Sequence, residues 1–240
     1  AAPLPALSEP PLNNPLDYLL YIPLTYFYSI IELVKHALGH PRVIAEGATF
    51  SASLLAILFS HEMGHYLACR YYKVDATFPY FIPAPPVFIA GTFGAFIKIR
   101  SAIPSRRALF DIGLAGPLAG FVVALPLSVV GVLTIGPSLP PEEYSMYLND
   151  PLLFRLIAKL GNVPLDRYSA GNAYYMAAWI GLLVTSLNLM PVGQLDGGHA
   201  TYAFFGARAH ARLGRLAFVV VLLLAPLGWL WHGAPSGIVY

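Results

Sequence analysis

The sequence predicts an all-α membrane protein, a polytopic bundle of about five to six transmembrane helices with a small re-entrant or β element. Of its 240 residues, 57% are hydrophobic and only 11% are charged, less than half the charged fraction of an ordinary soluble domain. Long apolar runs recur along the chain, separated by segments rich in Pro, Gly or charge. After loops are subtracted, this length holds about five or six spans of roughly 20 residues each.

Net charge and cysteine content exclude further classes of protein. The formal net charge is only +2 and the basic residues are scattered, so nucleic acid is not expected as a partner. The single cysteine, Cys69, excludes an intrachain disulfide framework. This composition predicts membrane lipid as a partner. The sequence does not indicate the oligomeric state of the protein.

The chain reads as one domain after a short lead-in. Residues 1–15 contain five prolines and little periodicity, which predicts an extended N-terminal segment. Residues 16–240 are expected to form a single transmembrane domain, with the functional motifs within about 47–205. Its first span runs from about Asp17 to Leu38 and is rich in Tyr and Phe, as expected at a membrane interface.

The second span, from about Gly47 to Tyr72, contains the motif H-E-x-x-H. On an α-helix His61 and His65 are four residues apart and share one face, so both imidazoles can bind one metal ion. Ionisable groups within an apolar span are costly and by default mark function. The alternative is a hydrogen-bonded pair of histidines that joins neighbouring helices.

Residues 73–107 do not read as a helix. Four prolines between Pro79 and Pro86 break helices, and glycines follow among β-branched and aromatic residues. We expect a re-entrant or interfacial loop that leads into a β-strand or hairpin at about Gly91 to Arg100. Non-helical backbone at membrane depth is tolerated only inside protein or at a wet cavity, so we expect this element beside the active site.

Three further segments complete the predicted bundle. The third span, about Ala108 to Ile135, carries GLAGPLAG, whose glycines allow close contact between helices. The fourth span, about Asn172 to Met190, ends in NLMPVGQLDGGH, where Pro and Gly stop the helix and present Asp196 on irregular backbone. A polar linker, Ala200 to Arg215, then precedes a last apolar run from about Leu216 to Trp231.

Basic residues predict the orientation of the bundle. The connections after spans two and four hold nine Lys or Arg, and those after spans one and three hold five. The positive-inside rule therefore places the first set in the cytoplasm. His61, His65 and Asp196 lie at that end of their spans. The prediction is thus an integral, multi-pass membrane protein with its active site toward the cytoplasmic side.

A catalytic zinc site needs three protein ligands and leaves one position open. Asp196 is the leading candidate for the third, because Zn²⁺ with ionised Asp196 and Glu62 sums to zero charge, whereas three histidine ligands beside Glu62 leave +1. His199 is the alternative third ligand. Asp196 has an alternative role too, in an Asp-Gly turn or a helix cap.

Hydrolysis is the reaction that this arrangement predicts. Zinc polarises a carbonyl and activates water, and Glu62 is placed to take a proton and return it to the leaving amine. Asn188, two turns before Asp196, is expected to contact the substrate or the developing oxyanion. A capping or interhelical hydrogen bond is the alternative role of Asn188.

Three motifs in this order resemble the site-2 protease family of intramembrane zinc metalloproteases. They are HEMGH in an early span, GLAGPLAG in the next and NLMPVGQLDGGH in a later one, over residues 47–205. FPYFIPAPP followed by GTFGAF resembles a subgroup found in bacteria, archaea and plastids. The segment between the third and fourth spans is too short for an inserted PDZ domain, as in the subgroup without one.

The resemblance implies a role for each motif residue. It implies His61, His65 and Asp196 as zinc ligands, Glu62 as catalytic base and acid, and Asn188 as a contact to the substrate or transition state. The implied reaction is regulated intramembrane proteolysis, in which a single-span membrane protein is cut in or near its transmembrane segment.

A substrate helix must unwind before attack, because its peptide carbonyls are hydrogen-bonded within the helix. We therefore expect the strand at Gly91, Thr92, Phe93 and Gly94 to bind the unwound substrate by β-strand addition.

The rival class is a non-proteolytic zinc transporter or carrier. A carrier is expected to string polar residues through several spans, whereas here they gather at one end of two spans. A third class is a catalytically silent scaffold, against which the intact Glu62 argues.

Overall fold

A computed structural model of the chain describes residues 15–84, 92–137, 149–166 and 169–232. The chain divides into two compact units, residues 1–48 and 49–240. The predicted N-terminal lead-in lies outside the described residues, except for Pro15 at the start of the first helix. The single domain over 16–240 stays a prediction.

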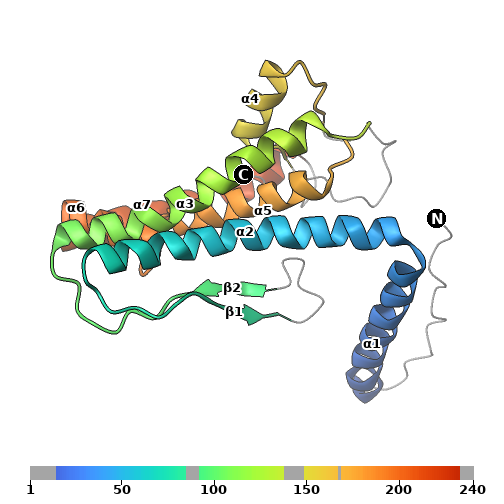
Figure 1. Cartoon of the computed structure of the whole chain (residues 1–240), viewed down its shortest axis with the longest axis horizontal. Helices are drawn as coiled ribbons and strands as arrows, with labels where there is room; N and C mark the ends of the chain where they lie inside the picture. Colours follow the sequence, from blue (N-terminus) through green and yellow to red (C-terminus); the bar gives the residue numbers. More distant parts are fainter. Residues whose placement is uncertain (1–14, 85–91, 138–148, 167–168, 233–240) are drawn as a thin grey trace. The chain divides into compact units, whose positions relative to one another are not determined.

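The described chain is mostly helical with one small two-stranded sheet, which confirms this part of the predicted fold class (Figure 1). The helices are α1 (Pro15–Gly39), α2 (Pro41–Tyr71), α3 (Arg106–Leu133), α4 (Leu152–Leu160), α5 (Ala173–Asn188), α6 (Asp196–Phe205) and α7 (Ala207–His232). Among the described residues, α2 and α3 are long and apolar enough to cross a membrane. They correspond to the predicted second and third spans.

Helix α2 ends with a Schellman-type cap. Lys73 adopts the left-handed conformation (φ 57°) that usually requires glycine, and its N–H bonds to the Arg70 carbonyl at 3.2 Å. The Val74 N–H bonds to the Cys69 carbonyl at 2.8 Å. This cap turns the chain back along α2 toward the sheet.

The sheet is an antiparallel hairpin of β1 (Tyr80–Pro83) and β2 (Thr92–Phe96). Tyr80 pairs with Phe96 and Phe81 with Ala95, and the register shifts between Phe81 and Pro83. The predicted strand near Gly91 to Arg100 therefore forms, although Gly91 itself lies outside the described residues. The hairpin runs beside the C-terminal half of α2 (Figure 1), where Phe81 stacks on Phe59.

Two expectations near the C-terminal motif are wrong. The backbone at Asp196 is helical rather than irregular, and most of the expected linker, Ala200 to Arg215, belongs to α6 and α7. A side chain at Gly197 would lie 2.0 Å from the Leu189 carbonyl oxygen. The glycines that predicted a break instead let the first turn of α6 pack directly on the preceding loop.

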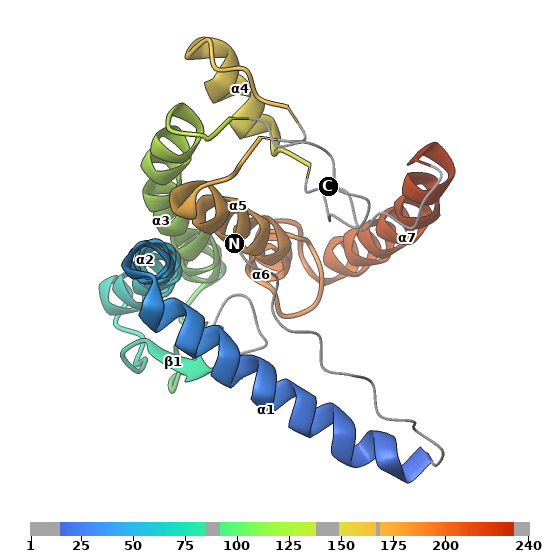
Figure 2. The ribbon, with the colours of Figure 1, turned by 90° about the vertical axis from the view of Figure 1, so that its right-hand side faces the viewer.

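Helix α3 is central to the packing of residues 49–240. One buried cluster joins α3 with α4 and α5 through Val132, Phe154 and Tyr175. A second joins α2 with α5 around Leu54, and a third joins the end of α2 with α3 around Cys69. Figure 2, which looks along α2, shows α3 beside it and α4 beyond α3.

Candidate metal centre

The two histidines of the H-E-x-x-H motif lie on the face of α2 that contacts α3. Only 4% of His61 and 7% of His65 is exposed. The helices touch backbone to backbone here, since a side chain at Gly64 would lie 2.2 Å from the Ala115 carbonyl oxygen. Close contact of this kind needs the small residues that both helices supply.

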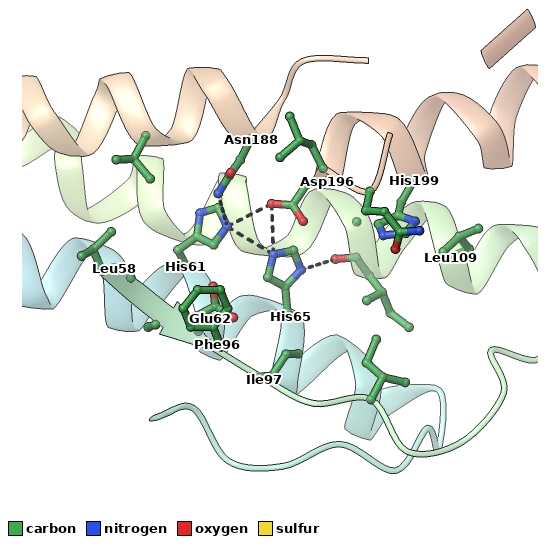
Figure 3. A pocket seen from close by; sticks show the side chains of 18 of the residues that line it. Leu58, His61, Glu62, His65, Phe96, Ile97, Leu109, Asn188, Asp196 and His199 are labelled. Carbon is green, nitrogen blue, oxygen red and sulfur yellow. Dashed lines mark hydrogen bonds and ion pairs between the residues drawn. The ribbon is translucent and has the colours of Figure 1, made fainter. Parts of the chain in front are cut away.

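Three potential ligand atoms converge at this contact (Figure 3). The Asp196 Oδ2 lies 3.0 Å from His61 Nε2 and 3.2 Å from His65 Nε2, and the two nitrogens are 3.2 Å apart. Tetrahedral zinc with bonds of about 2.0 Å separates two ligand atoms by roughly 3.3 Å. Among the described residues, this is the one group of three or more His, Cys, Asp or Glu with such convergence.

The tautomer of His65 favours a cation at this point. The His65 Nδ1–H donates to the Ile112 carbonyl at 2.7 Å, which leaves a lone pair on Nε2 of the neutral ring. That lone pair faces the Asp196 carboxylate and the second imidazole. Electron-rich atoms this close repel one another unless a proton or a metal ion lies between them. Two imidazole nitrogens and a carboxylate oxygen are a ligand set that zinc accepts, so the residues present fit a zinc ion.

Asp196 reaches the histidines from the first turn of α6. Burial raises the pKa of the Asp196 carboxyl, but when the imidazoles of His61 and His65 are protonated, their hydrogen bonds and positive charge outweigh it and lower the pKa to about 2. Asp196 is therefore ionised at neutral pH, as a metal ligand must be.

Glu62 lies beside the group and next to the hairpin. The Ile97 N–H, directly after β2, faces its carboxylate. Both residues line a cavity of about 430 Å³ that also contains the three converging side chains. Figure 3 shows Glu62 in the same opening as His61 and His65. The carboxylate thus lies next to backbone that borders the cavity.

The outer edge of β2 faces this cavity. Ile97 turns its N–H toward Glu62, whereas Lys98 and Arg100 turn theirs toward the preceding segment at Thr77 and Asp75. Backbone groups alternate along a strand, so the Ala95 N–H points to the same side as that of Ile97. Gly94, Ala95, Phe96 and Ile97 all line the cavity.

The predicted substrate-binding residues differ in their surroundings. Gly94 lines the cavity with a positive φ of 115°. The Thr92 hydroxyl instead holds the hairpin together, since it donates to the Ile82 carbonyl and accepts from the Gly94 N–H. Gly91 and the side chain of Phe93 lie outside the described residues.

Asn188 and His199 border the group from the α5 and α6 sides. The Asn188 Nδ2 lies 3.4 Å from His61 Nε2, at the last residue of α5. His199 lines the same cavity, but its ring is not part of the converging group. The geometry therefore favours Asp196 over His199 as the partner of the histidine pair.

Sequence reasoning did not find the backbone and glycine contacts that hold the imidazoles. A side chain at Gly116 would lie 2.1 Å from His65 Nε2, and one at Gly120 would lie 3.2 Å from the Cβ of His61. The glycines of GLAGPLAG predicted close contact between helices, but not that this contact positions the two imidazoles. The contacts from Ile97 and Ile112 use main-chain atoms and have no signal in residue type.

A family model, Peptidase family M50, matches residues 49–226, which contain every residue of the converging group. The chain belongs to peptidase family M50. This membership confirms the predicted family, with zinc as its metal and metalloprotease as its enzyme class. The family is membrane-associated, in keeping with the two apolar helices of this M50 chain.

Plant proteins are among the relatives of this M50 chain. It is 36% identical over 188 residues to "Probable zinc metalloprotease EGY1, chloroplastic" of Arabidopsis thaliana, which is 74% of this chain and 34% of the relative. It is 31% identical over 192 residues to "Probable zinc metalloprotease EGY2, chloroplastic" of the same plant, 76% of this chain and 31% of the relative. The matched region thus spans about a third of the length of these curated relatives.

Proposed function

We propose that this chain is an intramembrane zinc metalloprotease that hydrolyses a peptide bond in or near the transmembrane segment of a single-span membrane protein. One observation carries the proposal: the ligand atoms of His61, His65 and Asp196 converge in a cavity that also holds Glu62 and the edge of β2. Membership of peptidase family M50 supports both the metal and the reaction class.

In this mechanism His61, His65 and Asp196 hold the zinc ion. Bound zinc supplies Lewis acidity, which polarises the peptide carbonyl and activates water. Glu62 takes a proton from the attacking water and delivers it to the nitrogen of the leaving amine. The Ile97 N–H faces the Glu62 carboxylate, which lines the same cavity as the three converging side chains.

Substrate binding is assigned to the outer edge of β2 and to Asn188. The Ala95 N–H and C=O on that edge are available to pair with an unwound substrate strand, which fixes its backbone along the cavity. Asn188 is a neutral donor beside His61, and we assign it to the carbonyl oxygen that becomes negative during attack.

The proposed membrane arrangement is multi-pass, with about five to six spans, and α1, α2, α3, α5 and α7 are five of them. The active site is assigned to the cytoplasmic side. The unequal distribution of Lys and Arg between the two sets of connections supports this orientation.

A matched pair of glutamates on α2 tests the function. Glu62→Gln keeps the shape but removes the base, whereas Glu46→Gln makes the same change at an exposed position of the same helix. We expect both variants and the wild type to bind one zinc ion per chain. Cleavage of a single-span reporter in proteoliposomes should fall about 10²–10⁴-fold in Glu62→Gln alone.

The outcomes separate the competing functions. Full cleavage by Glu62→Gln would overturn the protease mechanism. Zinc bound by all three proteins without cleavage by any would instead indicate the non-proteolytic zinc carrier, and flux of zinc into the vesicles would then be the activity to measure.

Ala95→Pro tests the assignment of β2. Proline removes the N–H on the outer edge, so we expect cleavage to be lost while the zinc content and melting temperature stay at wild-type values. Unchanged cleavage would exclude strand addition at this edge.

A further inference from the structure

His199 is a half-buried histidine that lines the cavity of the metal centre without belonging to the converging group. Its imidazole makes no hydrogen bond or ion pair with any other residue that the structure describes. The rings of His61, His65 and His210 all make such a bond. A neutral imidazole always carries one N–H donor, so the His199 ring can donate to a molecule that enters the cavity.

The contact that places Asp196 also places His199. A side chain at Gly113 would lie 3.2 Å from the Asp196 carbonyl oxygen and 3.4 Å from the His199 Cβ. The two residues are three apart on α6, so they share one face of that helix. His199 is therefore fixed relative to the metal centre by the backbone of α3.

An unwound substrate exposes peptide groups on both of its edges. The outer edge of β2 can pair with one edge, and the other edge then faces α5 and α6. Figure 3 shows Phe96 and Ile97 on one side of the converging group, and Asn188 and His199 on the other with Asp196 between them. A peptide carbonyl left without a donor in such a cavity is costly, so a donor on the α5–α6 side stabilises the bound strand.

The α5–α6 side offers few neutral donors. Asn188 is already assigned to the carbonyl that is attacked. Gln194 lines the cavity too, but it is exposed and lies in the loop before α6, where water satisfies its amide. His199 is half-buried on a helix that Gly113 holds in place, so little freedom is lost when it donates a hydrogen bond.

We propose that His199 donates a hydrogen bond to a backbone carbonyl of the bound substrate, on the strand edge opposite β2. Carbonyls on one edge of a strand recur at every second residue. With the scissile carbonyl at Asn188, the carbonyl assigned to His199 is the next one along the same edge. The contact uses peptide backbone alone, so it is independent of the substrate's side chains. This assignment rests on the proposed protease function.

Binding of an uncut substrate tests the contact. Three variants are made in the Glu62→Gln background: His199→Leu removes the donor, His199→Gln keeps an N–H, and His36→Leu changes a half-buried histidine of α1 that does not line the cavity. Each full-length chain is purified in dodecyl maltoside with zinc. The dissociation constant of a fluorescent single-span reporter is measured together with zinc content and melting temperature.

We expect His199→Leu to weaken reporter binding about 10-fold, the effect of one neutral hydrogen bond, while zinc content stays at one per chain. His199→Gln should recover most of the affinity, and His36→Leu should bind like its parent. Equal binding by His199→Leu and its parent would overturn the proposal. Loss of zinc from His199→Leu would also overturn it, because His199 would then act at the metal.

A second reporter separates backbone from side-chain recognition. One reporter has alanine at the residues that flank the cut, and the other has serine. We expect His199→Leu to weaken both by the same factor, and a loss confined to the serine reporter would overturn the assignment to the backbone. Failure of the protease function gives a different result: the chain with Glu62 intact would bind both reporters and cleave neither.

Discussion

The two ends of α3 pack in opposite ways. At the metal end, the α3 backbone lies against the start of α6 at Gly113, against His65 at Gly116 and against His61 at Gly120. At the far end, Val132 packs on Phe154 and Tyr175, whose rings meet edge to face. The first contact fixes the position of polar groups, and the second buries large apolar side chains.

This difference separates function from stability along a single helix. Backbone contact buries little apolar surface per residue but leaves an imidazole no room to rotate. Contact through large side chains buries more apolar surface and tolerates small shifts. We therefore expect substitutions at the metal end to change zinc binding and cleavage, and those at the far end to change the free energy of unfolding.

The largest expected effect on stability is at the far end. Phe154→Ala removes a fully buried ring from the contact of α3, α4 and α5 and should cost about 3–5 kcal/mol of unfolding free energy. Leu156→Ala, on the exposed face of α4, is the control and should cost far less. Zinc affinity of the folded protein should stay at the wild-type value, and a large loss of zinc in Phe154→Ala would break the separation.

Asn188 and Asn172 lie at opposite ends of α5, so they extend the comparison of the metal end with the far end to a second helix. Asn188→Ala should reduce cleavage about 10²–10³-fold, because one donor to the developing oxyanion is lost, and should leave zinc bound. Cleavage rates and zinc content measured on the same preparation check this. A variant that loses zinc and cleavage together would show that Asn188 holds His61 rather than the substrate.

Gly116→Ala tests whether the position of the His65 ring depends on the absence of a side chain at residue 116. The added methyl group would lie 2.1 Å from His65 Nε2, so the ring must move and zinc affinity should fall about 10–100-fold. Gly47→Ala is the matched control on α2, where no atom lies within 4 Å of the new Cβ. Competition with a zinc chelator measures both, and equal affinities would show that the α3 backbone does not position His65.

The smallest expected effect is at Asn172, which caps α5 at the far end. Its side chain accepts from the Tyr175 N–H at 2.9 Å and donates to the Gly131 carbonyl at 2.9 Å. Asn172→Ala should cost about 1–2 kcal/mol of unfolding free energy with unchanged cleavage per folded molecule. Thermal unfolding and cleavage assays check this, and a catalytic defect here would contradict the division between the two ends.

Much of the candidate site is readable in the sequence because it depends on regular spacing. Four-residue spacing placed His61 and His65 on one helix face, and charge balance selected Asp196 from more than a hundred residues away. The β element near Gly94 followed from prolines and glycines that exclude a helix. Each of these signals is carried by residue types.

The remainder depends on tertiary contacts that residue types do not encode. Gly197 and Gly198 read as a helix break, yet they belong to α6 because the loop before it leaves no space for side chains. Main-chain groups of Ile97 and Ile112 orient Glu62 and His65, and any residue other than proline supplies an N–H, as every residue supplies a carbonyl. Such contacts become visible only once the helices and hairpin are placed.

The identity of the third ligand is the central claim, and zinc content tests it most directly. Zinc per chain is measured for the wild type, Asp196→Ala and His199→Ala after equal exposure to a chelator, with melting temperature as the check on folding. We predict one zinc in the wild type and in His199→Ala, and almost none in Asp196→Ala. Full zinc in Asp196→Ala together with its loss from His199→Ala would contradict the proposed centre.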